Sequence, residues 1–158
     1  MKQHTYQVQV EWTGNDGEGT KTYRSYRRDH SIVAEGKPQI MGSSDPAFRG
    51  DRSRYNPEEL LVAALSSCHM LSYLHLCAVN HINVVEYRDA AIGTMEESAD
   101  GSAQFAQVIL YPAVKISAES DRDQAQALHH DAHRLCFIAR SVNFPVEVAA
   151  EIEQAQAA

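Results

Sequence analysis

The chain has 158 residues, a formal net charge of −7 at pH 7 and 22% charged residues. This length favours one domain, residues 1–158, with a sizeable core. The acidic balance argues against nucleic acid or an anionic membrane as a main partner. Three cysteines are too few, and too odd in number, for a secreted disulfide scaffold. Residues 1–12 lack the apolar segment of a secretory signal, so we expect a cytoplasmic location.

The first third of the chain predicts short strands. Residues 6–12 alternate between apolar and polar side chains, which predicts a half-buried strand. The turn cluster at residues 14–19 predicts a hairpin into a second strand at residues 20–26. A third short strand is expected at residues 31–34. Residues 42–55 form a loop that is rich in turn formers and arginine.

Residues 56–80 predict one long helix. Asn56 is a suitable N-cap and Pro57 suits the first helical position. Glu58 and Glu59 place negative charge at the positive end of the helix dipole, and the spacing from Asn56 to Glu59 is close to a capping box. From residue 60 onward nearly every position is apolar or small, so we expect protein on most sides of the helix. Interspersed Ser, His and Cys residues argue against a membrane span.

The remainder predicts two long strands, a helix and a last strand. The strands are expected at residues 82–95 and 103–116, where Pro112 implies an edge or a bulge. Ser120 is the expected cap of an amphipathic helix that runs to about Ala139. Residues 145–152 form a final strand, followed by a frayed tail. This order predicts an α+β fold, with antiparallel sheets packed on two long helices.

Cys68 and Cys136 each lie on the expected buried face of a helix, and two interpretations are open. They are core cysteines, since free cysteine is often buried, or they form a redox pair in which one thiolate attacks a substrate and the other resolves the product as a disulfide. Cys77 lies nine residues past Cys68 on another part of the helix surface, where we expect it to pack.

A reactive thiol in the middle of a helix needs a nearby cation, because burial alone raises its pKa. Arg49 is our candidate, since its loop is able to fold back over the helix. Six arginines precede the helix: Arg24, Arg27, Arg28, Arg49, Arg52 and Arg54.

The eight histidines do not predict a metal site. His129 and His133 have ligand-compatible spacing, but we expect them largely on the polar side of their helix, and no carboxylate or cysteine set completes a signature. Neither His69 nor His75 is placed to act as a base toward Cys68 from the same helix.

The chain resembles the OsmC/Ohr family, the osmotically induced and organic-hydroperoxide-resistance proteins. The strongest match is the stretch NPEELL at residues 56–61, followed by Ala-Leu-Ser-Ser and Cys68. The second match is Cys136 near the end of the second helix, where this chain has Phe137 and the family has proline. The resemblance covers essentially the whole chain and is nearer to the OsmC and OsmC-like branches than to Ohr proper.

This resemblance implies an intertwined homodimer with active sites at the subunit interface. It implies a thiol peroxidase for organic hydroperoxides, with hydrogen peroxide as a further candidate substrate. Cys68 would be the peroxidatic cysteine and Cys136 the resolving one, while Glu58 would hold the catalytic arginine, for which Arg49 is the closest match. A small dithiol or lipoyl-type reductant would recycle the enzyme, with no metal or organic cofactor.

Helix geometry adds a constraint on such a site. Glu58 and Cys68 are ten residues apart, so they are separated by about 15 Å along a helix. Glu58 would therefore serve Cys68 from a second subunit or through a long arginine, which predicts an obligate dimer. The competing hypothesis is a non-enzymatic dimer on the same scaffold, which binds a small apolar ligand or acts as a slow redox sensor.

Overall fold

The computed structural model describes all 158 residues, which divide into two compact units, residues 1–60 and 61–158. The first unit contains a three-stranded antiparallel sheet in the order β1-β2-β3 and a short 3-10 helix, η1 (Pro46–Phe48). The strands are β1 (Gln9–Trp12), β2 (His30–Val33) and β3 (Ile40–Gly42).

The predicted strand at residues 20–26 is wrong, because residues 13–29 form a long loop and β1 pairs with β2 instead. Backbone hydrogen bonds close the base of this loop, from the Thr13 amide to the Asp29 carbonyl and from the Arg27 amide to the Gly14 carbonyl, both 2.9 Å. A Cβ atom at Gly14 would lie 1.8 Å from the Arg27 carbonyl oxygen, so only glycine fits this approach.

The prediction that the first strand is half-buried is also wrong for the single chain. All four residues of β1 are exposed, and Val10 keeps 62% of its surface accessible. Val10 pairs with Ile32, which in turn pairs with Ile40, so these three side chains lie on one face of the sheet. The first unit therefore carries an apolar face that its own residues do not cover.

Helix α1 (Pro57–Val79) begins with the predicted capping box. The Glu59 amide donates to the Asn56 side-chain oxygen at 2.8 Å, and the Asn56 amide donates back to a Glu59 carboxylate oxygen at 3.2 Å. The expectation of protein on most sides is wrong for one chain, because the fully buried residues form a single stripe at four-residue spacing: Leu65, His69, Tyr73 and Cys77. Length and apolarity alone would let α1 cross a membrane, but this stripe packs as core of the second unit.

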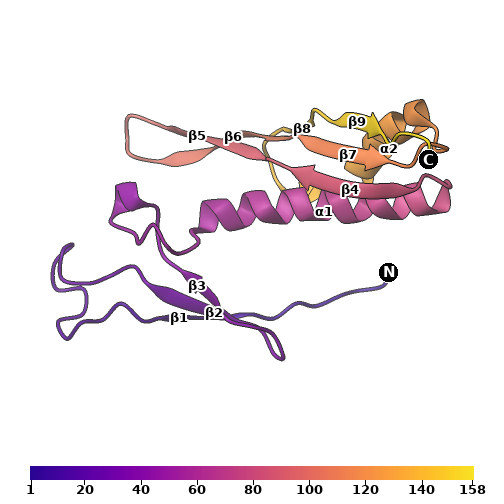
Figure 1. Ribbon diagram of the computed structural model, residues 1–158. Coiled ribbons are helices and arrows are strands. Elements are labelled where there is room, and N and C mark those ends of the chain that lie inside the picture. Colours follow the sequence, from indigo (N-terminus) through magenta and orange to yellow (C-terminus); the bar gives the residue numbers. More distant parts are fainter. The chain divides into compact units, whose positions relative to one another are not determined.

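The two predicted long strands of the second unit are each broken in the middle. They form β4 (Val84–Asp89), β5 (Ile92–Glu97), β6 (Ala103–Leu110) and β7 (Pro112–Ile116). β4 pairs with β7 and β5 pairs with β6, so the four strands make one long ribbon divided between two sheets (Figure 1). At the break, a carboxylate oxygen of Asp89 accepts a 2.7 Å hydrogen bond from the Tyr111 amide.

The sequence predicted that Pro112 lies at an edge or a bulge, but the structure places it in a central strand. It is the first residue of β7, which is the central strand of the sheet β4-β7-β9. A proline is tolerated at the first position of a strand because its missing N–H costs the ladder least there.

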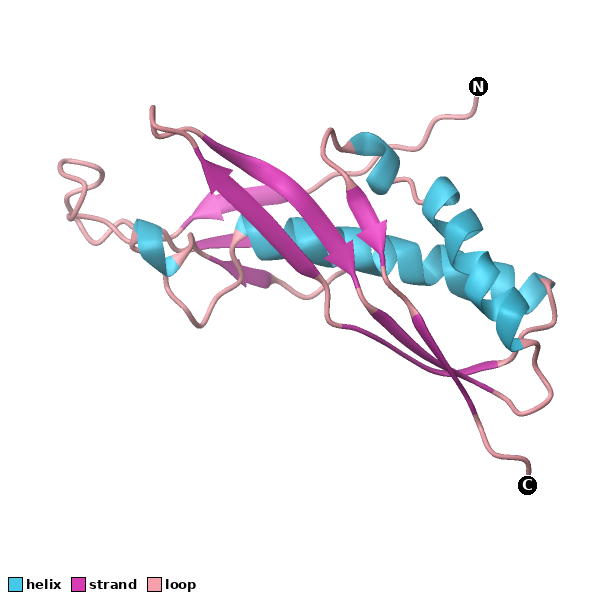
Figure 2. Cartoon of the chain, turned by 90° about the horizontal axis from the view of Figure 1, so that it is seen from above, coloured by secondary structure: helices cyan, strands magenta, loops and turns pink.

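The final predicted strand is two strands, β8 (Val146–Val148) and β9 (Glu151–Gln154). β8 pairs with β6 and β9 pairs with β7, and both pairings are parallel. The sheets of the second unit are therefore mixed, where antiparallel sheets were expected. Figure 2 shows these sheets crossing over α1.

Helix α2 (Arg122–Leu135) is shorter than predicted, with 14 residues against 23 in α1. Its N-cap is Asp121, whose side chain accepts from the Gln124 amide, while Ser120 instead accepts a 2.9 Å hydrogen bond from the Asn83 amide. The larger core cluster of the second unit joins residues of α1, β7, α2 and β9: Tyr73, Cys77, Ile82, Val114, Ile116, Ala125, Leu128, Ala132 and Ile152.

Candidate functional site

The structure brings Cys68 and Cys136 together across α1 and α2. Cys68 lies in the middle of α1 and is partly exposed, whereas Cys136 is buried at the C-cap of α2. The Cys68 thiol is close enough to raise the pKa of Cys136. The helices run antiparallel, because His69 contacts His129 and Tyr73, one turn further along α1, contacts Ala125, one turn earlier in α2.

The surroundings of Cys136 keep its thiol protonated. Burial is the main cause that raises the pKa of Cys136 to about 11, and the neighbouring Cys68 raises it further. The Ala139 amide, at the start of a short 3-10 helix, η2 (Ala139–Ser141), donates to the Cys136 sulfur at 3.4 Å and opposes this rise. The helix ends at Cys136 although the next residue is Phe137 and not a proline, since the backbone of Cys136 turns to an extended conformation with ψ 110°.

Cys77 is separate from this pair. It is buried in the main core cluster of the second unit, and burial raises the pKa of its thiol. The structure therefore agrees with the predicted packing position of this residue.

A buried pair of histidines joins the two helices that carry the thiols, and the sequence analysis missed it. The ring nitrogens His69 Nε2 and His129 Nδ1 are 3.0 Å apart, and His129 also stacks on Tyr73 with ring centroids 3.8 Å apart. The expectation that His129 lies on the polar side of its helix is wrong, since only 4% of its surface is exposed. Its spacing from Ala125 and Ala132, both buried, was the available signal.

Both histidines are held in the neutral form. Burial lowers the pKa of His69 to about 4 and that of His129 to about 3. Around His69, His133 on α2 lowers the pKa further and Asp89 at the end of β4 opposes the fall. A neutral pair allows one ring to donate an N–H and the other to accept it, which two charged rings would not.

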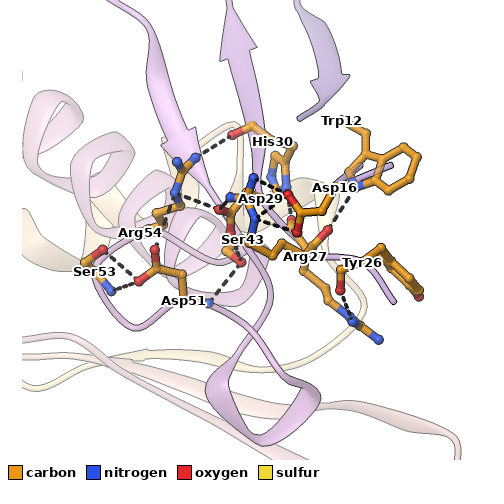
Figure 3. A network of polar contacts seen from close by, with 11 residues as sticks. Trp12, Asp16, Tyr26, Arg27, Asp29, His30, Ser43, Asp51, Ser53 and Arg54 are labelled. Carbon is orange, nitrogen blue, oxygen red and sulfur yellow. Dashed lines mark hydrogen bonds and ion pairs between the residues drawn. The ribbon is translucent and has the colours of Figure 1, made fainter. Parts of the chain in front are cut away.

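In the first unit, a polar network uses two of the six arginines that precede α1 (Figure 3). The buried carboxylate of Asp29 pairs with Arg27 and Arg54 and accepts from the Ser43 hydroxyl. Two exposed carboxylates complete the network. An oxygen of Asp16 lies 3.0 Å from a guanidinium nitrogen of Arg27, and an oxygen of Asp51 lies 3.6 Å from a guanidinium nitrogen of Arg54.

Arg28 is also occupied, because its guanidinium stacks over Tyr26 at 3.9 Å and donates to two backbone carbonyls. The side chains of Arg24, Arg49 and Arg52 make no hydrogen bond or ion pair in the structure. These three arginines are therefore the ones that remain available to a substrate or to another chain.

Arg49 lies in a loop whose conformation is fixed by backbone hydrogen bonds and a close backbone approach. It follows η1 in a left-handed conformation with φ 65°, and its amide donates to the Pro46 carbonyl at 3.1 Å. Next to it, a Cβ at Gly50 would lie 1.5 Å from the Ser44 carbonyl oxygen, so the glycine is required. The guanidinium of Arg49 lies 6.0 Å from the ring centroid of the exposed Tyr23.

Glu58 makes no ion pair with Arg49 within this chain. One of its carboxylate oxygens is buried and has no hydrogen-bond partner. A buried carboxylate oxygen without a donor is costly, so this oxygen of Glu58 is open to a hydrogen-bond donor. Its predicted pairing with an arginine stays a prediction.

The coupling between the thiols predicts a measurable change in Cys136. In a Cys68→Ser variant we expect the pKa of Cys136 to fall below that of the wild type, because the hydrogen bond and the charge interaction with Cys68 are lost, and to stay above the ordinary thiol value, because burial remains. The rate of alkylation by iodoacetamide as a function of pH measures this value. An unchanged alkylation profile would show that the thiols are not coupled.

The neutral histidines predict loss of stability in acid. Their folded-state pKa values lie below the ordinary value of 6.5, so the unfolded chain binds more protons between about pH 6.5 and pH 4, and stability falls as the pH falls through that range. Each histidine contributes a slope of about 1.4 kcal/mol per pH unit. We expect a His69→Gln/His129→Asn double variant to flatten the pH dependence of the urea midpoint, and the exposed-site variant His130→Gln to leave it unchanged. Parallel curves for wild type and double variant would contradict this assignment.

The chain matches the family model described as OsmC-like protein over residues 50–151. An OsmC-like protein of unknown function from Vibrio cholerae is 35% identical, with 97% of this chain and 100% of that chain covered and a TM-score of 0.82. Organic hydroperoxide resistance proteins from Elizabethkingia anophelis and Bacillus subtilis are 17% and 19% identical, with TM-scores of 0.68 and 0.59. Their alignments cover 98% and 94% of this chain, and 100% and 98% of theirs. No functionally curated protein sequence matches the chain. The resemblance seen in the NPEELL motif and the two cysteines is confirmed, and the chain belongs to the OsmC-like family.

Proposed function

We propose that this protein is a cysteine-based peroxidase that reduces organic hydroperoxides. The observation that carries the proposal is the pairing of a partly exposed thiol, Cys68, with a buried and protonated thiol, Cys136, on two facing helices. The family includes proteins named for organic hydroperoxide resistance, which agrees with a redox role.

The reaction follows from the different states of the two thiols. The Cys68 thiolate attacks one oxygen of the O–O bond, which gives a Cys68 sulfenic acid and releases the other oxygen as an alcohol after protonation. Cys136 then attacks the sulfenic sulfur, forming a disulfide with Cys68 and releasing water. A small external dithiol reduces the disulfide, and is itself oxidised to a disulfide. These steps need no metal or organic cofactor.

The ionisation of Cys136 suits its role as the second thiol. Before the reaction its high pKa keeps it as a neutral thiol, so it does not compete for peroxide. When Cys68 becomes a neutral sulfenic acid, its contribution to the raised pKa of Cys136 disappears. Cys136 then ionises more readily at the moment when it is required as the nucleophile.

We propose that the working protein is a homodimer in which Arg49 and Glu58 serve the thiols of the partner subunit. The uncovered apolar face of the first unit, the unpartnered carboxylate oxygen of Glu58 and the uncommitted Arg49 side chain support this. Arg49 would stabilise the Cys68 thiolate and orient the peroxide, and Glu58 would hold Arg49.

Single cysteine variants test the order of the two thiols. A Cys68→Ser variant should lose hydroperoxide turnover entirely, because the attacking sulfur is gone. A Cys136→Ser variant should consume one equivalent of peroxide to form a Cys68 sulfenic acid, detected by mass spectrometry after trapping with dimedone, and further equivalents should over-oxidise Cys68. The matched control is Cys77→Ser, which should retain turnover if it folds. Full turnover in the Cys68→Ser variant would reject the peroxidase proposal, and leave a ligand-binding or redox-sensing dimer as the better interpretation.

Mixed dimers test whether the site is shared between subunits. Arg49→Ala and Cys68→Ser are each expected to be inactive, with Arg52→Ala as the active control for loss of a loop arginine. After unfolding and refolding an equal mixture, half of the dimers contain one copy of each variant, and one of their two sites has both residues intact, so activity should return to about a quarter of the wild-type value. No recovery, although mixed dimers form, would place Arg49 and Cys68 of the same subunit in one site. An active Arg49→Ala variant would exclude Arg49 from the site.

A further inference from the structure

The hydrogen bond between His69 and His129 is the polar side-chain contact nearest to the two thiols that joins α1 to α2. His69 follows Cys68 directly, and His129 lies two helical turns before Cys136. Both rings are buried, with exposed fractions of 0% and 4%. His129 is held in place from a second side, because it stacks almost parallel on Tyr73 with an angle of 5° between the rings.

Spacing is critical for the two cysteines. A disulfide requires Cα atoms about 4.4–6.8 Å apart, whereas the axes of packed helices are about 8–10 Å apart. Two cysteines on facing helices therefore react only where the chains approach unusually closely. Cys136 is the C-cap of α2, where the backbone leaves the helix in an extended conformation, so its position is not bound to the usual spacing of helix axes.

We propose that the His69–His129 hydrogen bond is a positioning contact that holds Cys136 within bonding distance of Cys68. Its two ends are covalently fixed to the two cysteine-bearing helices, and its rigid aromatic rings set the separation of the helices beside the thiols. Neither histidine touches the reacting sulfurs as a base. Their effect on the rate of disulfide formation rests on the proposed function, but their effect on thiol spacing does not.

A second buried contact between the same helices provides the comparison. The Tyr73 hydroxyl donates to the Ala125 carbonyl at 3.0 Å, one helical turn further from the thiols. A general loosening of the helix pair would follow from losing either contact. A positioning role predicts that only the contact beside the thiols controls their spacing.

The first experiment measures thiol spacing without any peroxide. In glutathione buffers, the protein dithiol and oxidised glutathione exchange with the protein disulfide and two reduced glutathiones, so the equilibrium constant gives the effective concentration of one thiol at the other. His129→Phe keeps an aromatic ring for Tyr73 but removes the hydrogen bond. We expect it to lower the effective concentration about tenfold or more. His129→Asn, whose amide nitrogen replaces Nδ1, should stay within about threefold of the wild type.

Two control variants decide between positioning and general structure. His130→Gln changes an exposed neighbour on α2 and should keep the wild-type effective concentration. Tyr73→Phe removes the other buried contact and should also keep it, although it lowers the melting temperature. If His129→Phe kept the wild-type value, or if Tyr73→Phe lowered it as much, the inference would be wrong. Should His129→Phe fail to fold, His129→Gln replaces it, because its amide is one methylene too long for the Nδ1 position.

The second experiment connects spacing to the proposed reaction. In single turnovers with an organic hydroperoxide, His129→Phe should form the Cys68 sulfenic acid at the wild-type rate but form the disulfide about tenfold more slowly, and over-oxidised Cys68 should accumulate when the hydroperoxide is in excess. Equal slowing of both steps would overturn the positioning role. If wild-type Cys68 did not react with hydroperoxide, the proposed function would fail, while the glutathione equilibria would still decide the inference.

Discussion

The buried contact between α1 and α2 is the constraint on which the candidate site depends. The buried residues of α1 recur every four positions, and the second and third of them, His69 and Tyr73, both reach α2 through hydrogen bonds. One nitrogen of each histidine ring and the Tyr73 hydroxyl are paired between the helices, and the loss of such a partner in the core is costly, so these contacts favour one arrangement of the two helices. In our proposal these contacts also hold the thiols in place, because the two cysteines lie on the same two helices.

The two units of the chain contribute different chemistry. The second unit provides the thiols and the neutral histidine contact, with Cys136 protonated through burial. The first unit provides arginines, of which three are bound in local contacts, while Arg49 stands free on a loop that glycine and backbone hydrogen bonds hold in one shape. In our proposal these parts meet between subunits, where an arginine would pair with the Glu58 carboxylate and orient the peroxide at Cys68.

Local signals in the sequence predicted local structure well. The Asn56–Glu59 capping box and the start of α1 depend on neighbouring residues, and the structure confirms both. The two helical cysteines were singled out as a possible redox pair; the structure places Cys68 close enough to raise the pKa of Cys136, and the redox role stays a prediction. The sequence correctly predicted that Arg49 lies in a loop. It could not show which carboxylate pairs with this arginine.

The failures have one physical origin, which is that distant partners decide the outcome. The strand predicted at residues 20–26 does not form, because β1 pairs with β2. These two strands are far apart in the chain, so local patterns do not reveal their pairing. At the breaks between β4 and β5 and between β6 and β7, the Asp89 carboxylate accepts a hydrogen bond from the Tyr111 amide. These residues are 22 positions apart, so the sequence gives no local signal for the contact. His129 was assigned to the polar face because histidine is usually exposed, but its partner, 60 residues earlier, stabilises it in the core.

The central claim is that Cys68 and Cys136 form a redox pair. The most direct measurement is non-reducing mass spectrometry of the wild-type protein after one equivalent of an organic hydroperoxide, with peptide mapping of the product. Our account predicts a rapid loss of two hydrogen atoms and a single cross-link between Cys68 and Cys136, with Cys77 unmodified. Unchanged thiols after several minutes, or a cross-link that involves Cys77, would contradict it.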